Sequence, residues 1–443
     1  MGEEAEVTRE PTRVVIVGGG FGGFYTALNL ERCTRRGGPP LDVTLIHDAN
    51  ALVYTPFLPQ AAGGTLEPRH VVVPLRGPLK RTNILVGRAT AHDAQARTVT
   101  FTSEAGDRRV IGYDHLVAAP GSVSRTFPIP GLRESAIGFK TVAEAIHLRN
   151  HAIKQLELAT AGDDPAERAA RLTFVFVGGG YAGVEALGEV EDMMQEAKRL
   201  YPGLAGDRLR FALIEATESI FPEVGVRLSS YAMRELARRG VEMRLGTTIT
   251  DATGGGVTLS SGERIECRTL VWTAGVRSHP TMAMLGLPTD ARGRAVVDAT
   301  LAVDRMKGVW ALGDSAAVPD PARIGLPCPP TSQHAVRQAK VAARNILASI
   351  TGEKPARFTY RTRGIFADLG RGKAVASVLG LQFRGVPAWF LARTYHLSQI
   401  PGMARKGRVA IDWTVALLFR RDVAELGSLG HPAPLDTPDT PDP

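Results

Sequence analysis

Two glycine clusters carry the clearest chemical signal in this 443-residue chain. Each follows a short apolar run and precedes a stretch with helical character, and each has the spacing G-x-G-x-x-G. The six spaced glycines are Gly18, Gly20, Gly23, Gly178, Gly180 and Gly183. This spacing makes a tight turn, lets the backbone approach a pyrophosphate and turns a helix N-terminus toward the anion. One such loop alone is a weak signal, and two structural glycine turns are the alternative. Two loops in the same context predict two dinucleotides bound by one chain.

Carboxylates near the ends of the next strands indicate how each dinucleotide is held. Glu215 closes the run LRFALIE, 32 residues after Gly183. Its carboxylate would accept both ribose hydroxyls and repel a 2′-phosphate, which favours NADH over NADPH. The alternative is an exposed, unpaired glutamate. In the first unit His47 stands where the acid is expected and Asp48 follows it, so Asp48 either reaches the adenosine ribose or caps the following turn.

Three further strand ends predict how the chain passes between two nucleotide-binding domains. Residues 113–121 are an apolar run that ends in Ala-Pro-Gly, and residues 270–275, LVWTAG, would return the chain to the first domain. Residues 309–315, VWALGDS, end a strand at Gly313 and Asp314. An acid here can hydrogen-bond the ribityl or phosphate end of FAD, whereas the alternative is a helix cap.

Helical periodicity identifies the elements that would position these groups. Residues 331–350 have an apolar stripe at helical spacing, with Gln333 and Arg337 four apart and therefore on one face. Residues 143–158 predict a connecting helix. Residues 51–69 predict a loop whose large apolar side chains either cover a cofactor or close the core.

Composition excludes several classes of protein. Cys33, Cys267 and Cys328 form no C-x-x-C pair, which favours a reducing compartment and argues against a disulfide-exchanging flavoenzyme. The ten histidines include no HExxH pattern, so we expect no metal. The first eleven residues are acidic rather than apolar, and no run approaches the ~20 apolar residues of a membrane span. We therefore expect a cytoplasmic protein.

Positive charge gathers in the C-terminal region. Residues 354–421 hold 13 Lys or Arg against two acids, a surplus of +11 in a chain of net charge +8. No RNA-type aromatic motif accompanies this surplus, so we expect no nucleic-acid partner. We interpret the basic region as a footprint on anionic lipids.

Taken in order, the two glycine loops, the GVE at residues 183–185, Glu215, TAG, ALGDS and PPTSQHAVRQAK are distinctive. Over residues 13–421 the chain resembles the type II NADH:quinone oxidoreductases. The resemblance implies an α/β fold with two Rossmann-like, glutathione-reductase-like dinucleotide-binding domains and a C-terminal membrane-associating segment. The expected domains are an FAD-binding domain in two parts (12–140 and 291–352), an NADH-binding domain (141–290), a membrane-associating or dimerisation region (353–425) and a disordered tail (426–443).

The resemblance also implies the activity and several residue roles. Hydride would pass from NADH to FAD, and two electrons would then pass to a membrane quinone, with menaquinone expected and no proton pumping. Glu185 matches a family glutamate beside the flavin and nicotinamide, Gln333 matches a glutamine of the quinone pocket, and Lys373 matches a basic residue near it. Alternatively, Glu185 is only a charge in the first helical turn, Gln333 a hydrogen-bonding residue at a helix start, and Lys373 part of the basic surface. Arg337 stands where many members have a second glutamine, and it joins His396 among the candidates for moving protons.

The cofactor-binding residues predicted for FAD and NAD(H) come from all of these motifs. They are Gly18, Gly20, Phe21, Gly22, Gly23, Asp48, Ala119, Gly121, Gly178, Gly180, Tyr181, Gly183, Glu185, Glu215, Ala274, Gly275, Gly313, Asp314, Gln333, His334 and Ala335. The catalytic candidates are Glu185, Gln333, Arg337 and Lys373.

Residues 386–400 match the family's membrane-associating helix but are more polar than usual, with Arg393, His396 and Gln399. Aromatic and apolar side chains beside the positive charge would lie on the inner face of the cell membrane. They are Trp389, Phe390, Leu391, Tyr395, Trp413, Leu417, Leu418 and Phe419. A homodimer interface and a flap over the core are the alternatives.

Three other functions stay open. A sulfide:quinone reductase would need cysteines at the flavin, and only Cys328 lies near a plausible position. A soluble NADH-dependent flavin reductase with a non-quinone acceptor would suit the polar C-terminal helix. A non-catalytic NADH-sensing flavoprotein, like apoptosis-inducing factor, would change partner on reduction.

Overall fold

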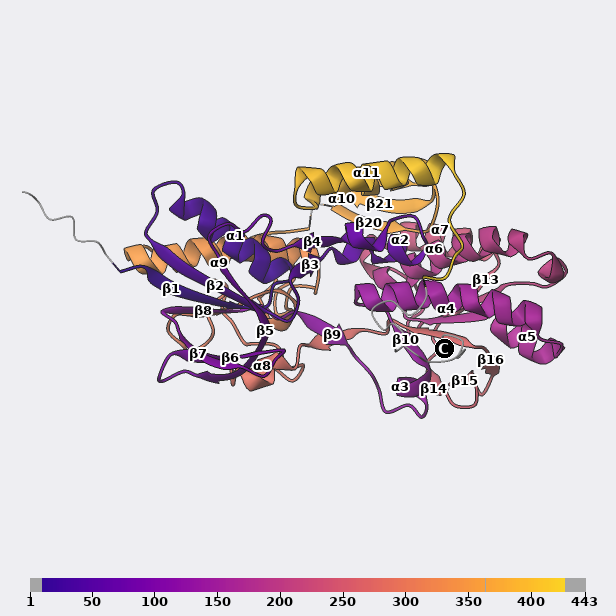
Figure 1. Cartoon of the computed structure of the whole chain (residues 1–443), viewed down its shortest axis with the longest axis horizontal. Coiled ribbons are helices and arrows are strands. Elements are labelled where there is room, and N and C mark those ends of the chain that lie inside the picture. The colour runs from indigo at the N-terminus through magenta and orange to yellow at the C-terminus, as the bar shows by residue number, and fades with distance from the viewer. Residues whose placement is uncertain (1–9, 363, 427–443) are drawn as a thin grey trace, which may run out of the picture. The chain divides into compact units, whose positions relative to one another are not determined.

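The structure, a computed structural model, describes residues 10–362 and 364–426. The described chain divides into two compact units, and each is built on one sheet with a parallel core (Figure 1). Unit 1 comprises residues 10–53, 72–123 and 276–362, and unit 2 comprises residues 54–71, 124–275 and 364–426. The chain therefore builds unit 1 from three separate segments, and two of the breaks fall near residues 123 and 275.

Unit 1 contains a seven-stranded sheet. In spatial order its strands are β19 (Val309–Ala311), β8 (His115–Ala118), β1 (Thr12–Val17), β2 (Leu41–His47), β5 (Asn83–Asp93), β6 (Thr98–Ser103) and β7 (Arg108–Gly112). The first five are parallel to one another, and β6 and β7 are added antiparallel. Smaller elements of unit 1 are β3 (Ala51–Val53), β4 (Val72–Pro74), β9 (Ser122–Ser124), β18 (Val276–Ser278) and α8 (Thr281–Met284).

Continuous apolar runs explain why the middle of this sheet is covered on both faces. The last four residues of β1 are all buried, as expected for a parallel strand rather than an alternating one. The helices α1 (Phe21–Thr34) and α9 (Ser332–Thr351) pack against each other. Thr331 caps the start of α9 by accepting a hydrogen bond from the His334 amide, and Gly352 ends it at a φ of 78°. The predicted helix at residues 331–350 is confirmed to within one residue.

Unit 2 contains a five-stranded parallel sheet. Its strands are β10 (Ala136–Gly138), β17 (Thr269–Trp272), β11 (Thr173–Val177), β12 (Arg210–Ile214) and β13 (Val241–Arg244). Its main helices are α4 (Val142–Ala161), α6 (Tyr181–Ala197) and α7 (Val226–Arg238), with shorter helices α2 (Leu58–Ala62), α3 (Leu132–Ser135) and α5 (Pro165–Arg171). A reciprocal capping box between Thr141 and Glu144 starts α4. The predicted connecting helix is confirmed and runs slightly beyond its predicted ends.

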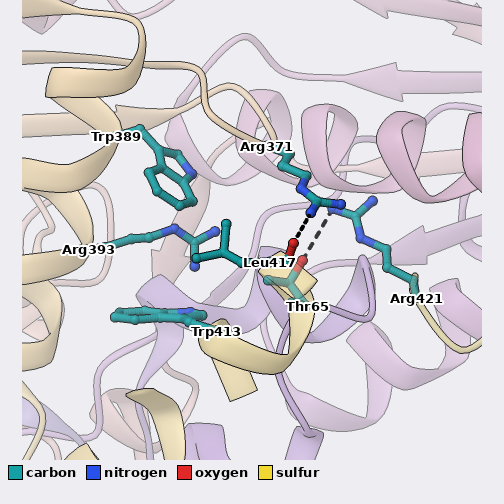
Figure 2. Close-up of a pocket in the computed structure, with 8 residues that line it drawn as sticks. Thr65, Arg371, Trp389, Arg393, Trp413, Leu417 and Arg421 are labelled. Carbon is teal, nitrogen blue, oxygen red and sulfur yellow. Dashed lines mark hydrogen bonds between the residues drawn. The ribbon is translucent and has the colours of Figure 1, made fainter. Parts of the chain in front are cut away.

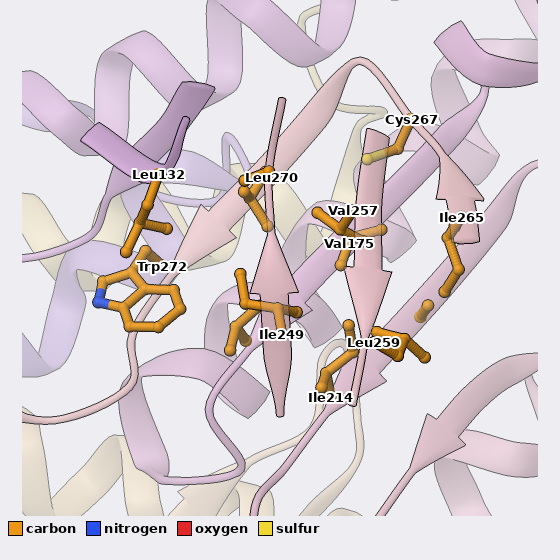
Figure 3. Packing of buried hydrophobic residues seen from close by; sticks show 13 residues of the cluster. Leu132, Val175, Ile214, Ile249, Val257, Leu259, Ile265, Cys267, Leu270 and Trp272 are labelled. Atoms are coloured by element: carbon orange, nitrogen blue, oxygen red, sulfur yellow. The ribbon is translucent and has the colours of Figure 1, made fainter. Parts of the chain in front are cut away.

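A second, antiparallel sheet in unit 2 covers one part of the parallel sheet. It consists of β14 (Ile249–Asp251), β15 (Gly256–Leu259) and β16 (Arg264–Glu266). Side chains from both sheets meet in one buried cluster, with Val175 and Leu270 from the parallel sheet against Val257 from the antiparallel one (Figure 3). This packing holds the strands that carry the second glycine loop.

The C-terminal region folds onto unit 2. The strands β20 (Gly364–Asp368), β21 (Ala374–Val378) and β22 (Leu381–Arg384) form an antiparallel sheet, and α10 (Val386–Gln399) and α11 (Met403–Leu418) follow it. Helix α10 packs on β21 and next to α11, which the yellow end of the chain shows in Figure 1. Within the described ranges, we find no helix that combines the length and the apolar character needed to span a bilayer.

One observation differs from the sequence-based boundaries. Residues 54–71 were predicted within the first part of the FAD-binding domain, but they pack with unit 2. The reason is that Phe57 is fully buried there, 5.7 Å from the ring of Trp413, whose indole N–H donates to Gln60. From residue 427 onward, the predicted disordered tail lies outside the described residues.

Candidate functional site

The first glycine loop joins β1 to α1 in unit 1. Gly18 has a φ of +104°, and a Cβ added there would overlap the Ala119 carbonyl. A Cβ at Gly23 would overlap Gly18 O, so both positions require glycine. By contrast, a Cβ at Gly20 would meet nothing within 4 Å, and no side chain caps the start of α1 there. The loop therefore leaves backbone and helix terminus open to an anion, which fits the pyrophosphate of FAD.

Phe21 and Gly22 open helix α1 directly after this loop. A Cβ at Gly22 would lie 2.9 Å from Leu312 Cδ1, so the helix packs closely on the segment after β19. The same close packing places the first glycine loop beside residues 309–315, whose Asp314 is predicted to bind FAD.

His47 and Asp48 form a pair at the end of β2. His47 Nδ1 lies 3.1 Å from Asp48 Oδ1, and the Asp48 side chain is 50% exposed. The His47 ring lies against Gly19, where an added Cβ would be 2.6 Å from Cδ2. Burial lowers the pKa of His47, and the charge of Asp48 opposes that shift. The position expected to hold a ribose-binding acid thus presents an imidazole packed on the loop and a carboxylate one residue later.

Residues 309–315, which include the predicted FAD-binding Asp314, are bonded to a second loop of unit 1. Ser122 Oγ donates to Asp314 Oδ2 at 2.6 Å, which connects the turn after Ala119 and Gly121 to the end of β19. The amide of Gly313 donates to Gln338 Oε1 at 2.8 Å. Sequence reasoning missed Ser122 and Gln338, although a buried glutamine within the apolar face of α9 was a detectable signal.

Helix α9 brings two of the predicted acceptor residues together. Arg337 Nη1 donates to the main-chain carbonyl of Gln333 at 3.1 Å. The two residues therefore share one face of the helix, as their four-residue spacing predicted. Tyr360, which sequence reasoning missed, donates its hydroxyl to Gln333 Oε1 at 3.1 Å, and its ring lies 4.3 Å from the Arg337 guanidinium. These contacts hold Gln333 and Arg337 on one surface of unit 1.

His334 and Ala335 occupy the opposite, buried face of the same helix turn. His334 Nδ1 lies 2.8 Å from Thr331 Oγ1, and burial lowers the pKa of this histidine. Ala335 is 5% exposed and would be in van der Waals contact with a side chain at Gly313. Both residues therefore anchor the start of α9 beside the Gly313 turn.

The second glycine loop, in unit 2, repeats the geometry of the first. Gly178 has a φ of +115°, a Cβ at Gly183 would overlap Gly178 O, and Gly180 is open. Glu215, directly after β12, accepts a hydrogen bond from the Gly179 amide at 2.5 Å through Oε2. Its Oε1 accepts from the amide and hydroxyl of Thr217. The alternative of an unpaired glutamate is wrong, because the carboxylate is held against the nucleotide loop.

Three more predicted cofactor residues border this loop. Tyr181 begins α6 with its ring 5.1 Å from Phe221, and its buried hydroxyl has no hydrogen-bond partner among the described residues. Burial raises the pKa of Tyr181 far above its usual range, so the hydroxyl stays protonated. Ala274 packs against the buried cluster of Figure 3, and Gly275 has a φ of +91°. An orphaned buried hydroxyl at a glycine loop fits a site built to meet a polar ligand.

Glu185 lies on α6, one turn after the loop. Its Oε1 accepts a hydrogen bond from the Asp368 amide at 3.0 Å. Burial raises the pKa of Glu185 well above its usual value, the Asp368 amide opposes this, and the charges of Asp368 and Glu189 add to it. Asp368 ends β20 and was not predicted as a site residue, since a lone acid at a strand end carries no distinctive pattern.

Lys373 lies on the turn before β21 and faces a different acid. Its Nζ is 3.4 Å from Glu235 Oε1 on α7. The described contacts therefore link Lys373 to Glu235 rather than to Glu185, so its role near an acceptor stays a prediction.

His396 on α10 is enclosed by aromatic rings within unit 2. Tyr54 Oη lies 3.2 Å from His396 Nδ1, and the rings of Phe57 and Tyr395 lie 5.9 and 5.2 Å away. Burial lowers the pKa of His396 to about 4, so the imidazole is neutral at physiological pH. The apolar segment at residues 54–58 thus closes the core of unit 2, and it is helical from Thr55 onward rather than a loop.

The C-terminal helices form a small pocket of about 10 Å³, enough for one water molecule (Figure 2). Arg393 lies between two indoles, with its guanidinium 4.2 Å from the Trp389 ring and 4.8 Å from the Trp413 ring. Both tryptophans are 8% exposed. Their predicted place on a membrane-facing surface is wrong, because the buried arginine draws both indole faces inward.

His147 and His151 have an H-x3-H spacing on α4, which the sequence-based expectation of no metal overlooked. His151 Nε2 lies 2.9 Å from the Arg268 carbonyl, and the two rings are 6.0 Å apart. Across residues 10–362 and 364–426, no group of three or more His, Cys, Asp or Glu side chains has a geometry that could hold a metal ion.

Comparisons with known proteins agree with this pair of nucleotide sites. The family model described as pyridine nucleotide-disulphide oxidoreductase matches residues 12–345. Over 439 residues the chain is 30% identical to the type II NADH:quinone oxidoreductase Ndh of Mycobacterium tuberculosis, covering 95% of this chain and 92% of that protein. It is 29% identical to the demethylphylloquinone reductase NdbB of a Synechocystis strain, covering 90% and 95% respectively.

A solved structure shows the same fold. The chain is similar to NDH2 from Plasmodium falciparum in complex with NADH, with a TM-score of 0.84, 18% identity, and coverage of 94% of this chain and 100% of that one. At this identity the likeness concerns the fold, and it confirms the predicted α/β architecture with dinucleotide-binding domains.

Proposed function

Because the chain belongs to the type II NADH:quinone oxidoreductases, within the pyridine nucleotide-disulphide oxidoreductase family, we propose that it oxidises NADH and reduces a quinone with FAD as its bound cofactor. The observation that carries the proposal is the pair of glycine loops, each with glycines that no other residue could replace and an open helix start. The bound flavin would accept a hydride from NADH and pass two electrons to the quinone. The side chains around these sites would bind the two nucleotides and the quinone.

Binding of the two nucleotides would use different residues in the two units. In unit 1 the first glycine loop would hold the FAD pyrophosphate, and the Ser122 and Asp314 pair would meet its ribityl or phosphate end. In unit 2 the second loop would hold NADH, with Glu215 on the ribose hydroxyls. The Glu215 carboxylate would repel a 2′-phosphate, so NADPH should be the poorer donor.

Gln333 and Arg337 are the residues we propose for the acceptor. Gln333 could donate an amide N–H to a quinone carbonyl, because its Oε1 is already bonded to Tyr360. Arg337 would stabilise negative charge that develops on the quinone oxygen. The quinone is proposed to be a naphthoquinone such as menaquinone, in line with the demethylphylloquinone reductase among the relatives.

We further propose that the protein attaches peripherally to the inner face of the cell membrane. Helix α11 exposes an apolar stripe at i, i+4 and i+7 through Ile411, Val415 and Leu418, which is 74% exposed. Phe390 on α10 is 65% exposed and adds to the exposed apolar surface. Exposed apolar side chains beside a basic segment favour an anionic lipid surface. A homodimer formed through the same stripe is the competing outcome.

One set of measurements tests the proposed function. The purified protein should be yellow, NADH should bleach the flavin band faster than NADPH, and a menaquinone analogue should restore the band with sustained turnover. A Gln333→Ala variant should bleach normally with NADH but reoxidise more slowly with quinone. Bleaching followed by slow reoxidation with every quinone would instead indicate an NADH-sensing flavoprotein, and rapid reoxidation by a soluble dye alone would indicate a flavin reductase.

Sedimentation with vesicles tests attachment. The protein should sediment with vesicles that contain phosphatidylglycerol and remain in solution with phosphatidylcholine vesicles. An Ile411→Asn and Leu418→Asn variant should lose sedimentation while keeping NADH-dependent bleaching. If that variant instead changes only the molar mass in solution, the stripe is a dimer contact and attachment is refuted.

A further inference from the structure

The end of the second parallel strand has the same place in both units. In unit 1 the first glycine loop leaves β1 beside the end of β2, and in unit 2 the second glycine loop leaves β11 beside the end of β12. His47 in unit 1 and Glu215 in unit 2 come directly after the last pair of these strands. The last pairs are Val17 with Ile46 and Val177 with Ile214.

His47 and Glu215 also lie against the middle glycine of their loops. An added Cβ at Gly19 would be 2.6 Å from His47 Cδ2 and 2.8 Å from His47 Cγ. An added Cβ at Gly179 would be 2.9 Å from Glu215 Cγ and 3.0 Å from Glu215 Oε2. His47 therefore occupies in unit 1 the place that Glu215 occupies in unit 2. Glu215 offers carboxylate oxygens there, whereas His47 offers ring nitrogens.

Asp48 decides which ring nitrogen of His47 can accept a hydrogen bond. Its Oδ1 lies 3.1 Å from His47 Nδ1. A carboxylate oxygen at this distance favours the tautomer with the proton on Nδ1, which leaves a lone pair on Nε2. Nε2 is bonded to Cδ2, the ring atom nearest to Gly19, so the lone pair belongs to the ring edge away from Asp48. The His47 side chain is 21% exposed, so part of the ring is accessible to a ligand.

We propose that His47 replaces the ribose-binding acid of the FAD site: its Nε2 accepts a hydrogen bond from a hydroxyl of the adenosine ribose, and Asp48 is the positioning residue that keeps the accepting tautomer. This inference rests on the proposed function, because it takes FAD as the ligand of unit 1. In dinucleotide-binding folds the acid near this strand end meets the ribose hydroxyls. An imidazole titrates much closer to neutral pH than a carboxylate, so FAD binding in this chain depends on pH where an acid would not.

The groups around His47 keep the ring neutral. Burial lowers the pKa of His47, and the neighbouring His279 lowers it as well. The charge of Asp48 and a hydrogen bond with the Ala51 main chain oppose these two effects. The net result is a pKa below the ordinary value for histidine, so Nε2 has its lone pair at physiological pH.

His279 is the second histidine of this cluster. Burial lowers its pKa, with Asp48 raising it and Arg88 and Arg277 lowering it. The Thr281 amide donates to His279 Nδ1 at 3.2 Å, so His279 carries its proton on Nε2. In this tautomer Nε2 of His279 is a donor, and it does not compete with His47 for the role of acceptor.

Asp48 itself is the competing acceptor for the ribose. Its side chain is 50% exposed, but it stands one residue beyond the position that Glu215 holds in unit 2. The corresponding residue of unit 2 is Ala216, whose side chain has no polar atom. The comparison between the two units therefore favours His47 as the acceptor.

FAD affinity of the full-length protein, followed by flavin fluorescence as FAD is removed and added back, tests the proposal without any turnover. His47→Phe keeps a ring against Gly19 but has no acceptor, so the affinity should fall ~10-fold. His47→Gln offers an amide oxygen instead of Nε2 and should stay within ~3-fold of wild type. Asp48→Ala should lose less than His47→Phe, because the ring still presents an acceptor nitrogen. An unchanged affinity in His47→Phe, or a larger loss in Asp48→Ala, would overturn the proposal.

The pH dependence of FAD affinity tests the imidazole directly. In the wild type the affinity should decline as the pH falls below about 6.5, because a protonated Nε2 cannot accept a hydrogen bond. The decline should disappear in His47→Gln and remain in His279→Gln, the matched control. A decline that persists in His47→Gln, or its absence from the wild type, would refute the assignment.

FAD analogues that lack the 2′ or the 3′ hydroxyl of adenosine test the wild-type protein itself. At least one analogue should bind ~10-fold more weakly than FAD to the wild type, and as well as FAD to His47→Phe. Equal binding of FAD and both analogues to the wild type would overturn the inference even if a variant failed to fold. If NADH reduced the flavin but no quinone reoxidised it, the proposed function would fail, while these affinities would still decide the role of His47.

Discussion

The substitution Arg421→Met should destabilise unit 2 strongly. Arg421 and Glu189 have side chains 4% and 0% exposed, and their ion pair is joined by Thr65. Methionine is similar in length but removes the cation, so the Glu189 carboxylate stays buried without its partner. Breaking one side of a buried pair costs about 3 to 5 kcal/mol. Arg393, 4.0 Å from the other Glu189 oxygen, compensates in part, so we expect a value of about 3 kcal/mol.

Urea unfolding followed by tryptophan fluorescence is the suitable assay, because Trp389 and Trp413 line the same pocket as Arg421 (Figure 2). The double variant Glu189→Gln and Arg421→Met should recover most of the loss, since no charge is then left unpaired. Arg420→Met, at an exposed neighbour, is the control and should change stability by less than about 0.5 kcal/mol. A loss below about 1 kcal/mol in Arg421→Met, or no recovery in the double variant, would refute the reasoning.

Three further outcomes follow from the described contacts. Gly23→Ala should yield protein that is largely free of flavin, because the new Cβ would overlap Gly18 O; a normal absorbance ratio of flavin to protein would contradict this. Glu215→Ala should raise KM for NADH about 10-fold and narrow the preference over NADPH, as steady-state kinetics with both coenzymes would show. His396→Gln should remove a pH-dependent part of stability. In the wild type the folded state resists protonation of this partly buried histidine, so the free energy of unfolding falls from pH 6.5 toward pH 4, by up to about 3 kcal/mol. Unfolding measured at several pH values should show a flatter profile in the variant.

Much of the nucleotide chemistry could be predicted from local patterns. The glycine loops, Glu215 and the pairing of Gln333 with Arg337 depend on spacing within one strand, turn or helix, and local geometry decides such spacing. The same reasoning located helix α9 to within one residue, because its apolar stripe and caps lie within the segment itself. For the same reason, the partners Ser122, Gln338 and Tyr360 were missed. Each reaches its target across a loop or from another element.

The C-terminal region shows where local patterns misled. Trp389 and Trp413 are aromatic residues in a basic segment, which is typical of a membrane-facing surface, yet both are buried around Arg393. An aromatic residue beside an arginine has two favourable outcomes, an outward interfacial position or an inward cation–π stack. Which one occurs depends on what else the helix packs against. Here α6 supplies a buried acid, Glu189, which lies 4.0 Å from the stacked arginine and is itself bonded by Thr65 and Arg421.

The sequence by itself determined that this chain has two strand-turn-helix units with glycine loops of the dinucleotide-binding type, because those signals lie within short segments of backbone. Only the tertiary structure decided that residues 54–71 pack with unit 2, that the tryptophans turn inward and that Asp368 joins Glu185. These facts depend on groups from distant parts of the chain that meet in the buried interior of unit 2. There the cost of an unpaired charge, which no local pattern records, decides the arrangement.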